Sequence, residues 1–563
     1  MNQNTNSPLK VLLYTASLFI IFSCSKDSDL FNEYVLADSE SDIETATDEN
    51  DNTNTEEDNI NIEDNTNPDT DDSNQEYTGP LKAFPTAFGG GSNATGGRGK
   101  ILYIVDTLDD TVAATFHSEN GVNDAYYTGG LQDALTLHDV GYIVFNVSGN
   151  IDIGVGGTKN WPKGNGQGIY VRGKTVFGQS APRGGITLTG GTFRIGGFNP
   201  DQGNIIIRYL RSRPIFNIEG VLSTKDDRQT WAFHFTGVND LMLDHVSGSF
   251  APDKIAGSAV RQENVTAPNC PCTNKGQTFQ YGLFADGHTG LYTEVNPDRP
   301  SNPEELIDNI SYLNNVLIST NRAPNMAFDG FGEVVNNVIH NGQSKSSRVY
   351  HDIRLNHLGN YYQRTNGVYS WIGGLESNDV PQVFTRRNVY SGSIKINGYN
   401  SGTIDLKGND SEDNTVLWIN NPDRNRIADP LNIAASQFPS TVPNPWAETT
   451  AQDAFNRLVV NGDIGAYKYL DDSGEVQEYR DSFDVKMLSV LRDNIDYKPK
   501  VAANWVLPNI PSNIRPTNYD TDNDGMSDSW EIQQFGNLDQ SYRGDFDGDG
   551  YENIEEYMNQ VDF

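Results

Sequence analysis

The sequence predicts an all-β fold, a right-handed parallel β-helix with a short helical C-terminal extension and a calcium-loop tail. Its 54 glycines and 26 tyrosines favour a turn-rich β protein. Strand-like segments recur at a spacing of roughly one β-helix coil, on the order of 20–30 residues. In residues 310–341, strand-forming runs end in asparagines, and aligned asparagines of successive turns can satisfy one another's amides. With 563 residues the chain is long enough for one large domain with additions.

The predicted β-helix begins near Ala83, where a glycine-rich turn leads into the first strand. Residues 130–135 have the pattern of a short helical turn, and residues 142–153 that of a buried strand continuing into a second. Runs of stackable aliphatic residues in the later segments are typical of parallel strands buried on one side. The segments expected to continue the coils are 174–191, 203–214, 239–247, 278–294, 310–341, 349–363 and 383–392.

After about Ser440 the β periodicity fades, and residues 449–470 and 481–494 have helical spacing. We therefore expect the β-helix domain to span 81–445. A helical extension over 446–515 should pack on it.

Residues 516–563 contain two EF-hand-like calcium-loop motifs, which begin 25 residues apart. Alternate carboxylates can wrap a hard cation, a glycine makes the sharp turn, and the final glutamate closes the site. Two full matches outweigh the alternative of a solvated acidic tail. The ligand positions are Asp520, Asp522, Asp524, Asp528 and Glu531 in the first loop and Asp545, Asp547, Asp549, Asn553 and Glu556 in the second. We expect these loops to bind calcium in a structural role.

The formal charge of −36 is concentrated near the two ends of the sequence. Residues 27–76 hold 19 acidic and no basic residues, and residues 520–563 hold 13 acidic residues against one arginine. About −5 remains for the other residues, so the middle of the chain can host a basic site. The acidic composition, rich in Asn and Thr, predicts a disordered tether over 25–80.

An apolar run from Val11 to Phe22 follows Lys10 and ends just before Cys24. This pattern resembles a bacterial lipoprotein signal over 1–24, with Cys24 as the lipidated residue. An ordinary signal peptide or a transmembrane anchor is the alternative, although the run is short for a membrane span. We expect an outer-membrane lipoprotein facing the cell surface or periplasm, or a secreted protein.

A specific motif lies within residues 310–341. Its members are Asn314, Asn315, Arg322, Pro324, Phe328, Asn336 and Asn337. Together with the strand that carries Asp244 and His245, this motif resembles the pectate lyase family, polysaccharide lyase family 1. The resemblance runs from about Ala83 to Asn494 and implies a parallel β-helix that cleaves an acidic polysaccharide by β-elimination.

The resemblance also implies a chemistry. A base removes the proton on the sugar carbon next to the carboxylate, and the glycosidic oxygen leaves. Because the carboxylate is already negative, cations must neutralise it before a base can work. In the family, calcium ions and basic side chains do this, and the base is an arginine, here Arg322. An arginine with an ordinary pKa is a poor base, so its placement against the proton must do much of the work.

Five positions depart from the family's pattern. Ala327 stands where the family has a second arginine, and Trp231 where many relatives have a calcium-binding aspartate. Lys254 and Gly257 occupy positions where relatives often have further carboxylates, and Thr289 replaces a lysine. We therefore expect Lys254 to neutralise a uronate directly.

Tyr281, His245 and His288 are further candidates for proton transfer, because a cation-lined cleft can shift the pKa of tyrosine or histidine usefully. Tyr281 has the alternative of a stacked β-helix aromatic, and His245 that of a buried, hydrogen-bonded structural residue. Arg208, Arg211 and Arg213 are predicted to alternate along one strand and so to share a face, where one of them binds substrate or all three form a solvated row.

These features predict a lyase of a uronic-acid polysaccharide, pectate or an algal uronate polymer such as ulvan, that releases unsaturated products. A dehydratase or exo-acting lyase on oligosaccharide ends is an alternative, suggested by an insertion at 260–276 that could block a groove. A non-catalytic glycan-binding β-helix is another, and a hydrolase is less favoured because no carboxylate pair is evident. We expect a monomer whose partners are an acidic glycan and, through its lipid only, a membrane. No nucleic-acid partner is expected.

Overall fold

A computed structural model describes most of the chain beyond residue 80. The described ranges are 81–119, 124–154, 171–196, 202–214, 230–260, 273–295, 306–318, 320–342, 346–365, 368–370, 381–391, 393–395, 403–405, 418–420, 432–497 and 505–563. The chain divides into two units, 1–77 and 78–563, and all described residues belong to the second. The predictions for Cys24, the signal segment, the tether and residues 261–272 of the insertion lie outside the described residues.

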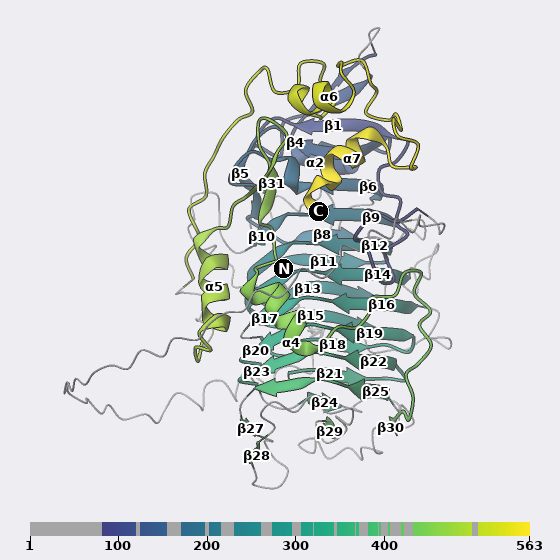
Figure 1. Ribbon diagram of the computed structural model, residues 1–563, viewed down its shortest axis with the longest axis vertical. Coiled ribbons are helices and arrows are strands. Elements are labelled where there is room, and N and C mark those ends of the chain that lie inside the picture. Colours follow the sequence, from purple (N-terminus) through teal and green to yellow (C-terminus); the bar gives the residue numbers. More distant parts are fainter. Residues whose placement is uncertain are drawn as a thin grey trace, which may run out of the picture. The chain divides into compact units, whose positions relative to one another are not determined.

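The second unit is a parallel β-helix, as predicted, and its strands form three rows (Figure 1). The first row is a 13-stranded sheet. In spatial order it contains β2 (Thr115–His117), β3 (Tyr126–Gly129), β1 (Ile101–Val105), β4 (Val140–Phe145), β6 (Arg172–Phe177), β9 (Gly203–Arg208), β12 (Asn239–Asp244), β14 (Asn274–Gln280), β16 (Ile307–Leu313), β19 (Phe331–Val335), β22 (Arg354–Leu358), β25 (Gln382–Arg386) and β30 (Asn432–Ile433). Apart from the pairing of β2 with β3, its strands run parallel.

The second and third rows belong to one 15-stranded sheet, because two long strands, β13 (Ser247–Val260) and β15 (Leu283–Val295), contribute to both. The second row also contains β5 (Gly149–Asp152), β7 (Ile186–Thr189), β10 (Arg211–Arg213), β17 (Val316–Ile318), β20 (Val338–His340), β23 (Tyr361–Gln363) and β26 (Val389–Ser391). The third row also contains β8 (Phe193–Gly196), β11 (Phe233–Thr236), β18 (Asn325–Ala327), β21 (Arg348–Tyr350), β24 (Val368–Ser370) and β29 (Trp418–Asn420). Each full coil therefore has three sides around one apolar core.

The corner between the first and second rows has a repeated geometry. The residue after the first-row strand has a positive φ in coil after coil, at Tyr209, His245, Tyr281, Asn314, Asn336, Gly359 and Arg387. The next position holds an asparagine ladder in the later coils, because the Nδ2 of Asn315 donates to Asn337, Asn337 to Asn360, and Asn360 to Asn388 at 2.8–3.0 Å. The ladder predicted for residues 310–341 is confirmed, and it extends two coils further.

Short helices and hairpins complete the described chain. These are α2 (Leu131–Thr136), η1 (Gly178–Ser180), α4 (Ala451–Phe455), η4 (Asn456–Val460), α5 (Ser482–Arg492), α6 (Asp528–Gln534), α7 (Asn553–Asn559), η6 (Gln560–Asp562), and the hairpins β27 (Ser393–Lys395) with β28 (Thr403–Asp405) and β31 (Lys468–Leu470) with β32 (Val476–Glu478). The helical spacing predicted within 449–470 and 481–494 corresponds to α4, η4 and α5. Within the described ranges, no helix combines the length and the apolar character needed to cross a membrane.

The helices of the extension and the helices of the tail pack on different parts of the β-helix. Residues of α4, η4 and α5 share an apolar cluster with Leu283, Val316 and Val338 of the second row. Residues of α6 and α7 share a second apolar cluster with β1, β4 and β6 near the start of the first row. Figure 1 draws α6 and α7 in yellow. The last 48 residues are therefore part of the folded body.

Candidate active site

The structure separates the predicted site residues into two groups. His245, Tyr281 and Arg208 lie at or beside the corner between the first and second rows, which we name the covered corner because C-terminal segments lie over it. Lys254 and His288 lie on β13 and β15 where these strands pass toward the third row, and Arg322 follows on the turn before β18. The contacts described below join the first group to the C-terminal segments.

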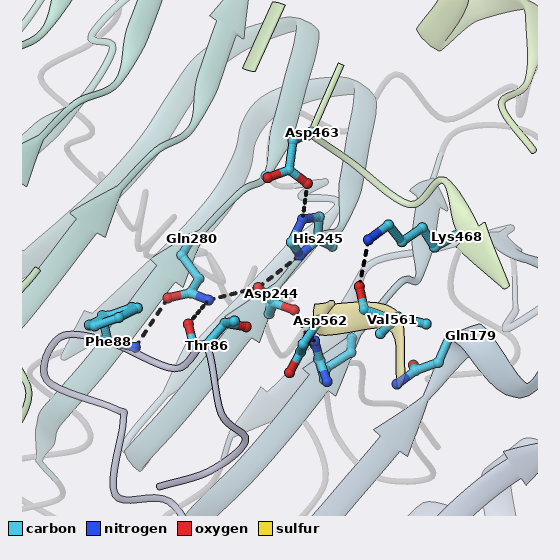
Figure 2. Close-up of polar contacts among 12 residues, drawn as sticks. Thr86, Phe88, Gln179, Asp244, His245, Gln280, Asp463, Lys468, Val561 and Asp562 are labelled. Atoms are coloured by element: carbon cyan, nitrogen blue, oxygen red, sulfur yellow. Dashed lines mark hydrogen bonds and ion pairs between the residues drawn. The ribbon is translucent and has the colours of Figure 1, made fainter. Parts of the chain in front are cut away.

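At the covered corner, His245 lies between the carboxylates of Asp244 and Asp463 (Figure 2). Its ring stacks between Tyr209 and Tyr281, with centroids 4.9 and 4.7 Å away and interplanar angles of 5° and 4°. Its Nδ1 lies 3.0 Å from Asp244 Oδ1 and its Nε2 lies 3.2 Å from Asp463 Oδ1. Because both ring faces are stacked and both ring nitrogens have carboxylate partners, His245 has no open face for a substrate. The structural alternative stated for His245 fits this placement, and a role in proton transfer does not.

The charges of this corner reinforce one another. Burial alone would lower the pKa of His245, but the carboxylates of Asp244 and Asp463 outweigh it and raise that pKa to about 9. Burial alone would raise the pKa of Asp244, but His245 and Arg208 hold it well below its usual range. The pair is therefore a buried imidazolium and carboxylate across the neutral pH range.

Tyr281 is also unsuited to the proton transfer that we predicted. Burial raises the pKa of its hydroxyl far above the usual value, which is the wrong direction for a base near neutral pH. Its ring is stacked on His245 and packed in the apolar cluster of the extension. Tyr281 therefore fits the alternative stated for it, a stacked aromatic residue of the β-helix.

Arg208 and Arg211 do not share one strand, which corrects the prediction. Arg208 ends β9, Tyr209 turns the chain through the corner, and Arg211 begins β10. The Arg208 Nε donates to Asp244 at 2.9 Å and its Nη1 to Asn559 at 3.1 Å, and its Nη2 pairs with Asp562.

Arg211 is likewise buried. It donates to the backbone carbonyls of Gly184 at 2.8 Å and Ala466 at 2.5 Å. Arg208 and Arg211 are therefore buried cations with structural partners. The prediction that they bind substrate is not supported by this placement.

Lys254 lies in an aromatic setting between the second and third rows. Its Nζ is 2.6 Å from Asp253 Oδ1, 5.4 Å from the ring centre of Trp231 and 4.9 Å from that of Tyr292. Trp231 Nε1 donates to the other oxygen of Asp253 at 2.9 Å and its ring stacks on His234 at 4.0 Å. The ammonium group is therefore fixed by one carboxylate and two ring faces.

Strand register brings the other two candidates close to Lys254. Lys254 pairs with Thr289 on the next coil, and Thr289 bridges to Asn321 on the coil after that. The backbone NH of Asn321 donates to the carbonyl of His288 at 2.7 Å. Neighbouring strands lie about 4.8 Å apart, so Lys254, His288 and Arg322 fall within about three coils of one another.

Arg322 sits on the turn between β17 and β18, as predicted. It has a φ of 56° and 2% of its surface is exposed. Arginine adopts such a backbone conformation rarely, which makes this turn one of the strained points of the coil.

Sequence reasoning missed a row of residues on the outer face of the third row. His234, Gly257, Tyr292, Asn325 and Arg348 are in register on β11, β13, β15, β18 and β21. Their neighbours Phe233 and Met326, among others, point into the core. The period-2 alternation in FHFT and in NMA could have indicated which side chains face outward.

Gly257 is needed at the centre of this row. A Cβ atom at this position would lie 1.8 Å from the carbonyl oxygen of Tyr292, and its φ is +153°. No side chain can therefore replace it without moving β15. The backbone at Gly257 therefore leaves no room for the carboxylate side chain that relatives often have at this position.

The third-row residues do not fit a bound calcium ion. In the part of the chain that the structure describes, every group of three or more acidic, His or Cys side chains with converging ligand atoms lies in the C-terminal loops. Trp231 stands where the resemblance implies a calcium ligand. The carboxylate of Asp253 beside it already accepts hydrogen bonds from Lys254 and Trp231. No step at this site is therefore assigned to calcium.

The two C-terminal loops, by contrast, fit calcium. The ligand atoms converge within 4.8 Å in three groups: Asp520, Asp522 and Asp524; Asp522, Asp528 and Glu531; and Asp545, Asp547, Asp549 and Glu556. Asp522 Oδ1, Asp524 Oδ2 and both Glu531 carboxylate oxygens are buried without a hydrogen-bond partner. Buried carboxylate oxygens of this kind require a cation or a proton.

One predicted ligand of the second loop has other bonds. Asn553 begins α7, its Oδ1 accepts from the Phe546 NH at 3.0 Å, and its Nδ2 donates to the Ser541 carbonyl at 2.8 Å. Ligand position 9 of such loops often acts through a water, so this arrangement is compatible with the loop type.

No protein-family model matches the chain. In sequence it is similar to the probable pectate lyase C of Aspergillus oryzae, with 26% identity over 332 residues, which are 58% of this chain and 62% of that protein. It is also similar to the probable pectate lyase C of Emericella nidulans, with 24% identity over 63% of this chain and 72% of that protein. The chain thus spans less than two thirds of the first of these relatives. Among solved structures, a pectate lyase of Paenibacillus aligns over 68% of this chain and 95% of its own, with 10% identity and a TM-score of 0.44.

Proposed function

We propose that this protein is a polysaccharide lyase that cleaves a uronic-acid polysaccharide by β-elimination. Two findings support the proposal: the sequence similarity to fungal pectate lyases and the parallel β-helix that the strand pairing defines. The observation that carries it is the register of Lys254, Thr289 and Asn321 on adjacent coils, which brings a fixed ammonium near Arg322 and His288.

In this proposal Lys254 neutralises the carboxylate of the sugar that loses a proton. Its position is fixed by Asp253 and by the faces of Trp231 and Tyr292, so little side-chain freedom is lost on binding. Trp231 replaces a carboxylate of the family's pattern, which removes a negative charge from the place where the anionic substrate would lie. Direct neutralisation by lysine therefore substitutes for a bound calcium ion.

Arg322 is the proposed base. In its neutral guanidine form it takes the proton from the carbon next to the carboxylate and becomes a guanidinium, a carbon–carbon double bond forms, and the bond to the glycosidic oxygen breaks. That oxygen leaves with a proton from solvent or a neighbouring acid and becomes a new sugar hydroxyl. His288 is the second candidate for this proton transfer, because its backbone carbonyl contacts the residue before Arg322.

The substrate class is proposed as pectate or an algal uronate polymer such as ulvan. An unbranched galacturonate chain suits the similarity to pectate lyases. The loss of calcium ligands around Trp231 favours a polymer that lysine and arginine can neutralise alone. A non-catalytic glycan-binding β-helix is the second candidate, because the same cationic and aromatic face could bind a uronate without cleaving it.

The decisive experiment follows the ultraviolet absorbance of the unsaturated product on pectate, ulvan and alginate. Wild type, Arg322→Lys and Lys254→Ala are compared with Arg354→Lys and Lys486→Ala, which replace exposed residues of the first row and of α5. We expect product on at least one uronate polymer and slower product formation in the first two variants only. Binding of a uronate polymer with no absorbance change would support the non-catalytic alternative.

A further inference from the structure

The C-terminal tail shares a core with the first coils of the β-helix. Trp530, Tyr542, Ile554 and Tyr557 of the tail form one apolar cluster with Leu102 and Tyr142 of the first row. At Gly525, inside the first calcium loop, a Cβ atom would lie 3.2 Å from the side chains of both Ile554 and Leu102. The loop itself therefore touches β1.

Polar contacts join the same two parts. Arg98 donates to Glu555 at 2.7 Å, and the NH of Gly99 donates to Glu552 at 2.8 Å. The NH of Leu102 donates to the hydroxyl of Tyr542 at 3.1 Å. These contacts lie between residues separated by 440–457 positions.

The end of the tail reaches the covered corner, as Figure 2 shows for Val561 and Asp562 beside Asp244. Lys468 Nζ donates to the Val561 carbonyl at 2.6 Å. Arg208, fully buried, takes Asn559 and Asp562 as partners in addition to Asp244. Without the tail, this guanidinium would lose two of its three side-chain hydrogen-bond partners.

The metal ligands and the anchoring side chains alternate on the same two helices. Glu531 follows Trp530 on α6, and Glu556 precedes Tyr557 on α7. Each helix has seven residues, which is too short to be stable on its own. Their order must come from packing on the β-helix and from whatever neutralises the converging carboxylates.

We propose that the tail is a calcium-dependent clamp: calcium in its two loops holds α6 and α7 on the first coils of the β-helix and keeps Asp562 on Arg208. The clamp is independent of the proposed elimination, because its ligands lie on the tail and Lys254 and Arg322 lie on later coils. The ions bind the docked and ordered loops, so binding and docking stabilise each other.

The size of the effect follows from linkage. For one site that forms only when docked, calcium at about 100 times its Kd shifts the docking equilibrium by about 100-fold. Magnesium should act weakly, because it demands a tighter octahedral shell than these loops present.

The test uses the full chain in EDTA, in CaCl2 and in MgCl2 at equal ionic strength. Calorimetry gives the number of ions, and hydrogen exchange followed by mass spectrometry reports on the backbone amides of β1 and β4. We expect two calcium ions and amide exchange in β1 and β4 that is at least about tenfold faster in EDTA, while β16 and β19 are unchanged. MgCl2 should resemble EDTA.

Variants separate the clamp from a general loss of stability. Glu531→Gln should lose one ion and expose β1 to exchange, while Glu478→Gln, an exposed glutamate of β32, should behave as wild type. Asp562→Asn should keep both ions and speed exchange only around Arg208 to Arg213. Two bound calcium ions with unchanged exchange in β1 and β4, or no calcium binding at all, would overturn the proposal.

Discussion

The guanidinium of Arg208 pairs with the carboxylate of Asp562, which lies 354 positions further along the chain. The same guanidinium donates to Asp244, the neighbour of His245. The buried charges at the covered corner are thus completed by the last helical turn of the protein. The covered corner therefore stabilises the fold, and the chemistry is expected near Lys254 and Arg322, between the second and third rows.

Arg322→Lys should lower kcat on the best uronate substrate by about 100-fold or more, the scale expected for a positioned proton-transfer group. Lysine keeps the positive charge but cannot reproduce the planar guanidinium. Melting temperature is the folding control, with Arg354→Lys as the matched variant. A folded Arg322→Lys protein that turns over at the wild-type rate would transfer the role of base to His288.

Lys254→Ala should raise KM for the uronate polymer by about tenfold or more, because a fixed ammonium beside Asp253 is lost. Lys254→Arg should restore part of the affinity, since it returns a cation to the faces of Trp231 and Tyr292. Added calcium should rescue neither binding nor rate. If Lys254→Ala regained the wild-type KM in calcium, a metal ion would be able to occupy the site of the lysine ammonium.

His245 should make stability depend on pH in the alkaline range. Its folded pKa of about 9 lies above the ordinary value of 6.5, so its contribution is fully present below about pH 6.5 and is lost as pH rises through 9. The contribution can reach about 3 kcal/mol by linkage. Thermal unfolding between pH 6 and 10 should show this loss in wild type. In His245→Gln the slope should be flatter, and an identical slope in both proteins would contradict the assignment.

Asn337→Ala should destabilise the fold by about 1–3 kcal/mol, because buried donors and acceptors lose their partners. Asn337 accepts from Asn315 and donates to Asn360 and to the Tyr312 carbonyl. Asn456→Ala, at an exposed position of η4, should cost far less. Denaturant unfolding compares the two, and equal losses would show that the ladder adds no special stability.

Cys24→Ser should move the protein from the membrane fraction to the soluble fraction, if the lipoprotein prediction holds. The thioether-linked lipid needs the cysteine sulfur, and serine cannot supply it. Fractionation of cells that express either protein, followed by immunoblotting, measures the change. An unchanged membrane fraction for Cys24→Ser would remove the prediction.

Local sequence predicted what depends on local repetition. The ladder through Asn315 and Asn337 was visible because each coil places an amide at the same corner position, where amide pairs with amide. The turn that carries Arg322 was visible because Pro324 and the flanking strands limit the backbone there. The calcium loops were visible because metal geometry fixes the ligand spacing.

Local sequence did not predict that Arg208 and Arg211 are buried. The strand ends at Arg208 because Tyr209 adopts a positive φ, a conformation that is uncommon for an aromatic residue. The partners Asp463 and Asp562 come from segments more than 200 residues away, and no pattern around Arg208 or His245 indicates them. A charged residue on a strand can therefore look like a substrate-binding residue in the sequence although a distant segment covers it in the fold.

The contacts between Arg98 and Glu555 and between Leu102 and Tyr542 also set an order of events during folding. A coil in the middle of the β-helix can form once its neighbours exist, because its partners lie only some 20–40 residues away. The first coils cannot finish until the far end of the chain has been synthesised, since their last partners are about 450 positions later. The first coils of the β-helix consequently gain their last native contacts only after the C-terminal tail has docked.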